Sequence, residues 1–321
     1  MLKVENLTKQ YFYGQKAIDN LTFEINKGEV VAVVGASESG KTSLLKCIAG
    51  LYSLEEGKIY IDGKDISELK IKERDVKFLY SDSGYGIFKR RTVKHNIGYP
   101  LKVRKVKKDV RAQKVEEVAE KYDIKSLLND YGYMLYEDDI LRVIFARKDI
   151  RNASVTLIDD VFKIVKSEDR AKLFNELHSH IRDENSAVLF ATTSIDEAFS
   201  VADRVIILNY GKCQQVATAE ELKSNPKTLT VEKLVNPYRT IIESEEVITT
   251  YDLEENELGE EYGVVSHTYE RGKYVVVTEL GIITTGVLKN SYKLRVKPNS
   301  ERYFNPISEE RIEKALYGRF P

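Results

Sequence analysis

One eight-residue segment limits the folds open to this chain more than any other feature. Residues Gly35–Thr42 read Gly-Ala-Ser-Glu-Ser-Gly-Lys-Thr and match the pattern G-x-x-x-x-G-K-[ST]. The apolar run Val30–Val34 before it predicts a buried strand, and the helical spacing of Thr42–Ala49 after it predicts a helix. A glycine-rich turn between a strand and a helix presents backbone N–H groups to an anion. The segment therefore predicts a phosphate-binding loop, with Lys41 at the terminal phosphates and the Thr42 hydroxyl on magnesium.

A second apolar strand ends in a carboxylate. Val155–Asp159 is a mostly apolar strand that ends in Asp159, and such a carboxylate can hold a magnesium ion opposite Lys41. Asp159 follows Lys41 by 118 positions. That separation leaves room for an inserted helical subdomain, which we expect at about residues 90–150.

The apolar runs alternate with segments of helical spacing. Further β-branched runs occur at Ala187–Ala191 and Val205–Leu208. Strands that alternate with helices predict a parallel α/β sheet that is buried on both faces. We expect this α/β domain to cover residues 1–236.

The composition changes after residue 236. Residues 242–262 contain nine carboxylates and no Lys or Arg, which predicts an acidic, solvated linker over 237–262. Beyond it, short β-branched runs at Tyr274–Thr278, Ile282–Thr285 and Tyr292–Val296 predict a small all-β domain over 263–321.

The charge balance limits the partners. Lys and Arg number 50 and Asp and Glu 51, which argues against a general nucleic-acid binder. Residues 89–108 hold nine basic residues and no acid, as a solvated helical face or a docking surface near anionic lipid would. The apolar runs are far shorter than the roughly 20 residues of a membrane helix. We expect a soluble, cytosolic chain without a zinc site, since it has only two cysteines.

Further segments follow the pattern of one family. They are Leu7–Tyr11, Lys27–Glu29, Glu56–Gly63, Ala202–Val205 and Ala219–Leu222. With the glycine-rich loop and Asp159, they make the chain resemble the ATP-binding cassette ATPase subunits of ABC transporters. It is most similar to the sugar- and osmolyte-importer branch, of which the maltose-importer ATPase is the best-known type.

The resemblance implies a fold and a ligand. The fold would be a P-loop NTPase α/β core with an antiparallel β segment, an inserted helical subdomain and a small C-terminal OB-like β domain. The ligand would be ATP with Mg²⁺, its adenine stacked on Tyr11, for which Phe12 and Tyr13 are alternatives. Thr42 and Asp159 would hold the metal. The residues that would contact the nucleotide are Gly35, Ser37, Ser39, Gly40, Lys41, Thr42 and Ser43.

The resemblance also implies partners and a location. The partners would be transmembrane permease subunits and a second ABC cassette, identical or different, and not nucleic acid. The location would be cytoplasmic, peripheral at the inner face of the cell membrane.

The residues of the catalytic cycle depart from the family pattern. The signature that opens a helix and contacts a γ-phosphate falls at Leu135–Asp139, where three acids replace its usual residues. The catalytic Glu is replaced by Asp160, and the switch histidine by Thr193. A base displaced by about 1 Å can cost on the order of a hundredfold in rate.

Three other motifs are altered as well. The Q-loop glutamine falls at Ser81–Ser83, the dimer-contact loop reads Lys163–Lys166, and Glu38 stands where the family usually has Gly. Together these changes predict ATP binding with weak or lost hydrolysis.

Two alternatives stay open at the level of sequence. The chain would be a regulatory or scaffold protein if it used the cassette as a binding module without transport. It would be an active ATPase if Asp160 served as the base. Co-purification with a permease separates the first alternative from a transporter subunit, and a turnover measurement tests the second.

Overall fold

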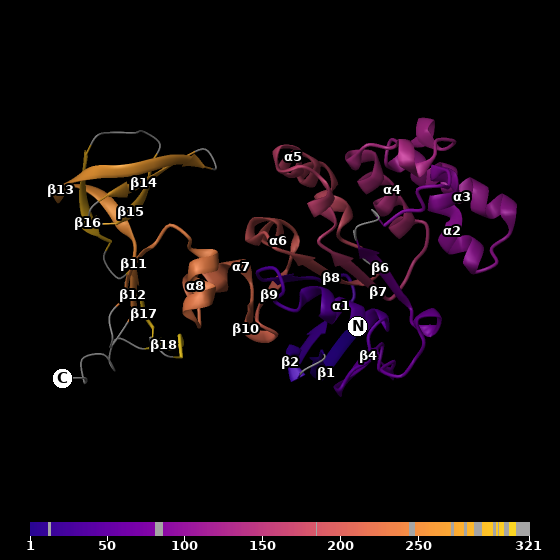
Figure 1. Ribbon diagram of the computed structural model, residues 1–321, viewed down its shortest axis with the longest axis horizontal. Helices are drawn as coiled ribbons and strands as arrows, with labels where there is room; N and C mark the ends of the chain where they lie inside the picture. The colour runs from indigo at the N-terminus through magenta and orange to yellow at the C-terminus, as the bar shows by residue number, and fades with distance from the viewer. Residues whose placement is uncertain are drawn as a thin grey trace. The chain divides into compact units, whose positions relative to one another are not determined.

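The apolar run before the glycine-rich loop forms strand β3 (Val30–Val34), which lies inside a six-stranded sheet of order β10-β9-β3-β8-β7-β6 (Figure 1). All five residues of β3 are buried, and the strand pairs in parallel with β8 and with β9. Burial on both faces explains why these runs are apolar throughout. The other strands are β6 (Val76–Tyr80), β7 (Val155–Asp159), β8 (Ala187–Thr192), β9 (Arg204–Asn209) and the antiparallel β10 (Lys212–Ala217).

A second, antiparallel sheet has the order β2-β1-β4-β5. Its strands are β1 (Leu2–Gln10), β2 (Lys16–Ile25), β4 (Glu56–Ile61) and β5 (Lys64–Asp65). One apolar cluster joins Ile18 of this sheet, Leu44 of helix α1 (Lys41–Ala49) and Leu157 of the parallel sheet. Helix α1 is therefore packed against both sheets, and this packing fixes the end of the glycine-rich loop.

Three helices occupy the stretch where an inserted helical subdomain is expected: α2 (Val93–Val103), α3 (Lys108–Lys121) and α4 (Glu137–Asp149). Helix α2 begins after Thr92, whose hydroxyl accepts a hydrogen bond from the backbone N–H of His95 at 3.3 Å. All nine basic residues between 89 and 108 are exposed. Their exposure is compatible with both interpretations of this stretch, a solvated helical face and a docking surface. Two further helices follow, α5 (Ser167–Leu177) and α6 (Ile195–Val201).

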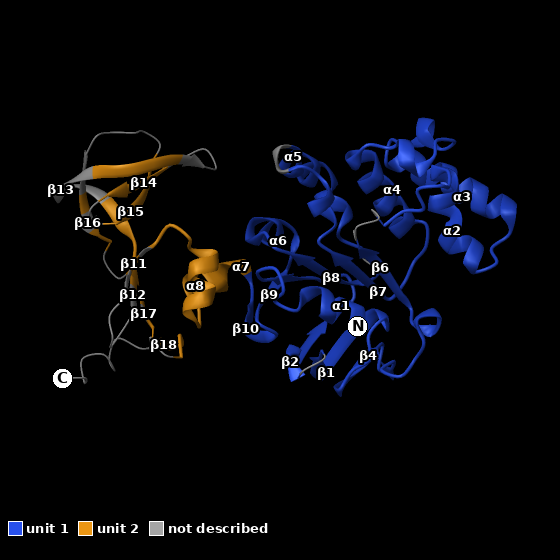
Figure 2. Cartoon of the chain, viewed as in Figure 1, with its two compact units in different colours: residues 1–218 blue, residues 219–321 orange. Residues whose placement is uncertain are grey.

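The chain divides into two units, residues 1–218 and 219–321, which are described separately (Figure 2). The structure is a computed structural model that describes residues 1–11, 14–80, 86–183, 185–243, 248–270, 273–278, 281–285, 291–297, 300, 302–304 and 308–312. No helix within these ranges is long and apolar enough to cross a membrane. The division falls earlier than the expected boundary at 236, because helices α7 (Ala219–Ser224) and α8 (Leu229–Val235) make their contacts with C-terminal strands.

The second unit contains strands where the sequence suggested a linker. Two sheets have the orders β11-β12-β17-β18 and β15-β14-β13-β16. The register of β13 and β16 places Glu254 opposite Arg295 and Glu261 opposite Lys293. The acidic stretch is therefore part of a sheet, where the sequence analysis expects a linker. The bounds are β11 (Thr240–Glu243), β12 (Ile248–Tyr251), β13 (Leu253–Glu270), β14 (Lys273–Thr278), β15 (Ile282–Thr285), β16 (Ser291–Val296), β17 (Arg302–Phe304) and β18 (Arg311–Ile312).

A buried carboxylate joins α8 to the strands of the second unit. Glu232 is fully buried, with its Oε1 2.8 Å from Arg239 Nε. The hydroxyl of Thr250 donates to the same oxygen at 2.8 Å, and Arg302 Nη1 donates to Oε2. Removing one partner of a buried ion pair destabilises a protein, because the remaining charge stays buried without a counter-charge.

We therefore expect Glu232→Ala to destabilise the second unit by about 3–5 kcal/mol, since Arg239 and Arg302 would both lose the buried carboxylate that they share. Hydrogen exchange of the β12 and β17 amides in the full chain measures this loss. The matched control is Glu220→Ala, at an exposed position of α7. Equal exchange in the two variants would contradict this account of the unit.

Candidate functional site

The glycine-rich loop joins β3 to α1 and passes so close to other backbone that two of its positions, 35 and 40, have room only for glycine. A Cβ on Gly35 would lie 2.1 Å from the carbonyl oxygen of Leu208 in β9. A Cβ on Gly40 would lie 2.1 Å from the carbonyl oxygen of Ala17 in β2, and Gly40 has φ +105°. The loop is therefore held between β9 on one side and β2 on the other.

Lys41 lies inside the curl of this loop. Its Nζ donates to the carbonyl oxygens of Gly35 and Ala36, each at 2.7 Å, and to Ser39 Oγ at 3.2 Å. Burial lowers the pKa of Lys41, while the carboxylates of Asp160 and Asp159 act in the opposite direction. No side chain caps the first turn of α1. The first N–H groups of this helix therefore have neither an intrahelical acceptor nor a capping side chain, and they are available to an anion at the loop. This end of the loop is built to bind an anion.

Asp159 and Thr42 are brought together as the sequence analysis expects of a shared metal site. The Thr42 hydroxyl donates to Asp159 Oδ1 at 3.0 Å, and Asp159 is buried at the end of β7. Burial raises the pKa of Asp159, against the effect of the hydrogen bond from Thr42. Among the described residues, no group of three or more His, Cys, Asp or Glu side chains is placed to hold a metal ion. One hydroxyl and one carboxylate suit Mg²⁺, which takes few protein ligands and completes its shell with phosphate oxygens and water.

A cavity of about 510 Å³ opens beside the loop. Tyr11 lines it, and the hydroxyls of Tyr11 and Ser43 are hydrogen-bonded at 2.6 Å. The ring of Tyr11 meets Tyr52 edge-on, with 6.2 Å between the ring centroids. Phe12 and Tyr13 lie outside the described residues. The full lining is Tyr11, Gln15, Lys16, Ala17, Glu38, Gly40, Lys41, Thr42, Ser43 and Tyr210.

The other two serines expected at the nucleotide differ in environment. Ser39 is buried and its hydroxyl contacts Lys41, whereas Ser37 is exposed. Ser39 therefore supports the lysine, and Ser37 lies on the open side of the loop.

Asp160, which the sequence analysis places at the position of the catalytic glutamate, is part of an ion-pair network. Arg170 Nη2 donates to Asp160 Oδ1 at 3.1 Å, and Arg170 Nε donates to Glu197 Oε1 at 2.7 Å. Burial opposes the charge on Arg170, but the hydrogen bonds and charge of Glu197 outweigh it, with help from Asp160, and raise its pKa. Glu197 also accepts from the Thr192 hydroxyl at 2.6 Å.

Thr193, which the sequence analysis places at the position of the switch histidine, is exposed and follows β8 directly. Its neighbour Thr192 points inward to Glu197, so the end of β8 is tied to the arginine network. The Q-loop positions Ser81–Ser83 lie outside the described residues.

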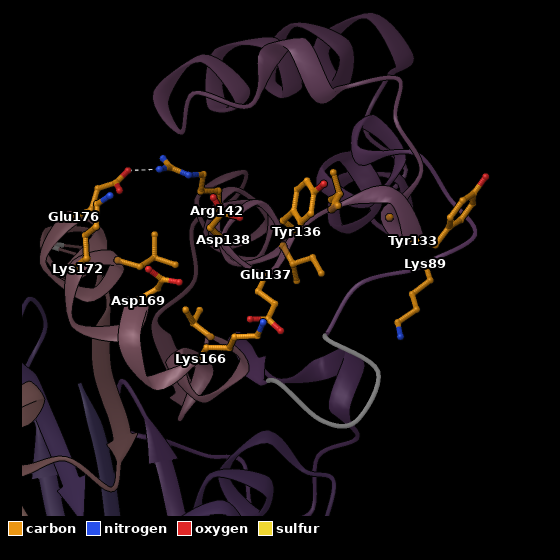
Figure 3. Close-up of a pocket in the computed structure, with 15 residues that line it drawn as sticks. Lys89, Tyr133, Tyr136, Glu137, Asp138, Arg142, Lys166, Asp169, Lys172 and Glu176 are labelled. Carbon is orange, nitrogen blue, oxygen red and sulfur yellow. Dashed lines mark hydrogen bonds and ion pairs between the residues drawn. The ribbon is translucent and has the colours of Figure 1, made fainter.

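The acidic signature positions begin helix α4, as the sequence analysis expects. Glu137, Asp138 and Asp139 form its first turn after Tyr136. Burial raises the pKa of Asp139, and the charge of Asp138 adds to the shift. A cavity of about 790 Å³ lies beside this turn, between α4 and α5 (Figure 3).

The charges of this second cavity are balanced. Four acids line it, Glu137, Asp138, Asp169 and Glu176, and so do four basic residues, Lys89, Arg142, Lys166 and Lys172. Arg142 is ion-paired with Glu176, as the dashed line in Figure 3 shows. The acidic run at the start of α4 is a local sequence pattern. Most of the basic residues that balance its charge come from other segments, which only the fold brings close.

Sequence reasoning missed two residues of these sites. Arg170 is separated from its partners by 10 and 27 positions, and no local pattern marks such a pairing. Tyr210 lines the first cavity from the turn between β9 and β10. Its signal was a Tyr-Gly pair where a two-residue hairpin favours Asn-Gly.

The comparisons with known proteins agree on one family. Residues 18–163 match the family described as ABC transporter. The chain is 33% identical over 243 residues to the molybdate/tungstate import ATP-binding protein WtpC of Pyrococcus horikoshii, with 76% of this chain and 69% of that protein covered. It is 32% identical to the Fe(3+) ions import ATP-binding protein FbpC 1 of Haemophilus influenzae, with 71% and 69% covered.

A solved structure has the same fold. It is the dimeric, post-hydrolysis structure of the ATP-binding cassette MJ0796 bound to ADP and Pi, which is 25% identical and aligns with a TM-score of 0.59. The alignment covers 68% of this chain and 98% of that one.

Glu38 gives a test of the loop geometry, because it has φ +65°, a conformation that costs an L-residue roughly 1–2 kcal/mol and a glycine almost nothing. We expect Glu38→Gly to raise the free energy of unfolding of the first unit by about 1 kcal/mol, measured by urea unfolding of the full chain.

The matched control is Glu38→Ala, which removes the same charge and keeps a Cβ. It should give no gain in stability. If alanine stabilised the chain as much as glycine, charge rather than backbone strain would explain the effect.

Proposed function

This chain belongs to the ABC transporter family, as an ATP-binding cassette of the import type, and on that premise we propose that it binds Mg-ATP with weak or lost hydrolysis. The observation that carries the proposal is the joined pair of Thr42 and Asp159 beside Lys41. Lys41 and Thr42 line the cavity with an ammonium and a hydroxyl, and the Asp159 carboxylate accepts a hydrogen bond from that hydroxyl.

The residues of the loop would each have one task. Lys41 would exchange its loop contacts for terminal phosphate oxygens, and the first N–H groups of α1 would take the remaining ones. Thr42 and Asp159 would hold Mg²⁺, which when bound neutralises charge on the phosphates. Tyr11 would offer its ring to the base.

Weak hydrolysis is supported by three features of the site. Asp160 is shorter than glutamate and is hydrogen-bonded to Arg170. Thr193 cannot take up or release a proton as an imidazole does. The first turn of α4 carries three carboxylates where a partner's phosphate would be expected to dock.

The partners follow from the relatives. Proteins named as import ATP-binding proteins are similar to this chain, and the solved cassette of similar fold is a dimer. We propose that this chain also works with transmembrane permease subunits, at the cytoplasmic face of the membrane, and pairs with a second cassette. The exposed basic residues of 89–108 suit a position near anionic lipid.

Binding is tested with Lys41→Ala. Loss of the ammonium should weaken ATP binding by about 1.5–3 kcal/mol, the range for hydrogen bonds to charged groups, as measured by calorimetry with magnesium present. The control is Lys58→Ala, which removes an exposed lysine of β4. Equal affinities of the Lys41 variant and the wild-type chain would contradict the proposed role of the loop.

Hydrolysis is tested by phosphate release. We expect turnover far below the roughly 1–10³ s⁻¹ of ordinary enzymes, with no recovery in Asp160→Glu, because Thr193 and the α4 acids are unchanged. Wild-type turnover in that range, abolished by Asp160→Ala, would show instead an active ATPase with Asp160 as its base.

A further inference from the structure

The turn between β9 and β10 carries a tyrosine in an unfavourable conformation. Lys212 pairs directly with Asn209, so Tyr210 and Gly211 form a two-residue hairpin loop. Their φ angles are +45° and +78°, as in a type I′ turn. Such turns favour Asn-Gly, and a bulky side chain at positive φ is rare. Strain of this kind is kept where it serves a function.

Backbone contacts fix this turn against the glycine-rich loop. The N–H of Gly211 donates to the carbonyl oxygen of Ser39 at 3.0 Å, and the N–H of Asp19 donates to the carbonyl oxygen of Gly211 at 3.0 Å. A Cβ on Gly211 would lie 2.9 Å from the carbonyl oxygen of Ala17. The position of Tyr210 is therefore set by the same elements that shape the nucleotide cavity.

The side chain of Tyr210 is exposed to solvent at the wall of this cavity. It is 84% exposed, and it lines the 510 Å³ cavity together with Tyr11 and the start of α1. Burying such a ring in the core would be favourable, so its exposure at a cavity wall has a cost that a ligand can offset.

The two tyrosines of the cavity are held differently. Tyr11 is fixed through its hydroxyl to Ser43 and by the edge-on contact with Tyr52. Tyr210 extends from a turn on another element. Phosphate oxygens are bound by cations and N–H groups, which Lys41 and the start of α1 supply. The face of an aromatic ring instead binds another flat π system, such as a nucleobase.

We propose that Tyr210 is a second base-binding residue, whose ring stacks on the nucleobase of a nucleoside triphosphate held by the glycine-rich loop. The inference rests on the proposed function, since it takes the phosphates to be bound at Lys41. Every base has a π face, so stacking on Tyr210 adds affinity for purine nucleotides in general and does not select adenine over guanine.

The test is Tyr210→Asn in the full chain, with Tyr210→Phe as the matched control. Asparagine suits the turn, so the variant should melt at a higher temperature than the wild-type chain. Its affinity for Mg-ATP should nevertheless fall about fivefold or more, and its affinity for inorganic tripolyphosphate with magnesium should be unchanged. Phenylalanine keeps the ring and should keep the ATP affinity. If Tyr210 were only structural, the substitution that raises the melting temperature would not lower the affinity for ATP.

Two outcomes overturn the inference. Equal ATP affinity in Tyr210→Asn and the wild-type chain, with tripolyphosphate bound by both, removes the base contact and leaves the phosphate site intact. A wild-type chain that binds neither ATP nor tripolyphosphate overturns the proposed function, and this inference with it.

A second measurement uses the absence of tryptophan from the chain. Tyr210→Trp places the only tryptophan of the variant at the cavity, where it can be excited selectively over the tyrosines. ATP should quench its fluorescence through stacking, whereas tripolyphosphate should not. The control is Tyr131→Trp, at a partly exposed tyrosine that does not line this cavity. The same response to ATP and tripolyphosphate at position 210 would contradict stacking.

Discussion

The close backbone approach of the glycine-rich loop to two strands is the constraint on which the rest of the first unit depends. Gly35 leaves no room for a side chain beside Leu208, and Gly40 leaves none beside Ala17. The loop is thereby fixed between the parallel sheet and the antiparallel one. Helix α1 starts from this point, which places Thr42 within hydrogen-bond distance of Asp159 on β7. The turn at Gly211 docks on the same loop, so the walls of the cavity share one support.

The parts of this arrangement that were readable from sequence are those with a local pattern. The run Val30–Val34, the loop and α1 are contiguous, and the fold class expected from them is confirmed by the solved cassette of similar fold. Arg170 was not readable, because its partners come from two other segments that only the fold brings close. The stretch 237–262 misled for another reason. Its carboxylates favour a solvated linker, whereas the residues that pair with them in β16 lie 32 to 41 positions further along the chain, beyond any local pattern.

Arg170 joins Glu197 to Asp160, the residue that the resemblance places at the catalytic position. Asp160 has φ +42°, and its carboxylate is hydrogen-bonded to an arginine that Glu197 also binds. Glu197 in turn accepts from Thr192 at the end of β8, next to the position of the switch histidine. These side chains satisfy one another within the protein. On the proposed function this network would be one reason for weak hydrolysis, since a base for hydrolysis must instead point to a water at the γ-phosphate.

The cavity beside α4 is lined by acidic and basic side chains together. Its four acids are matched by four basic residues, so its formal charge does not by itself repel a triphosphate (Figure 3). The obstacle is local. Glu137, Asp138 and Asp139 occupy the first turn of α4, where they interact favourably with the positive end of the helix dipole. A phosphate would have to compete with these carboxylates for the same N–H groups.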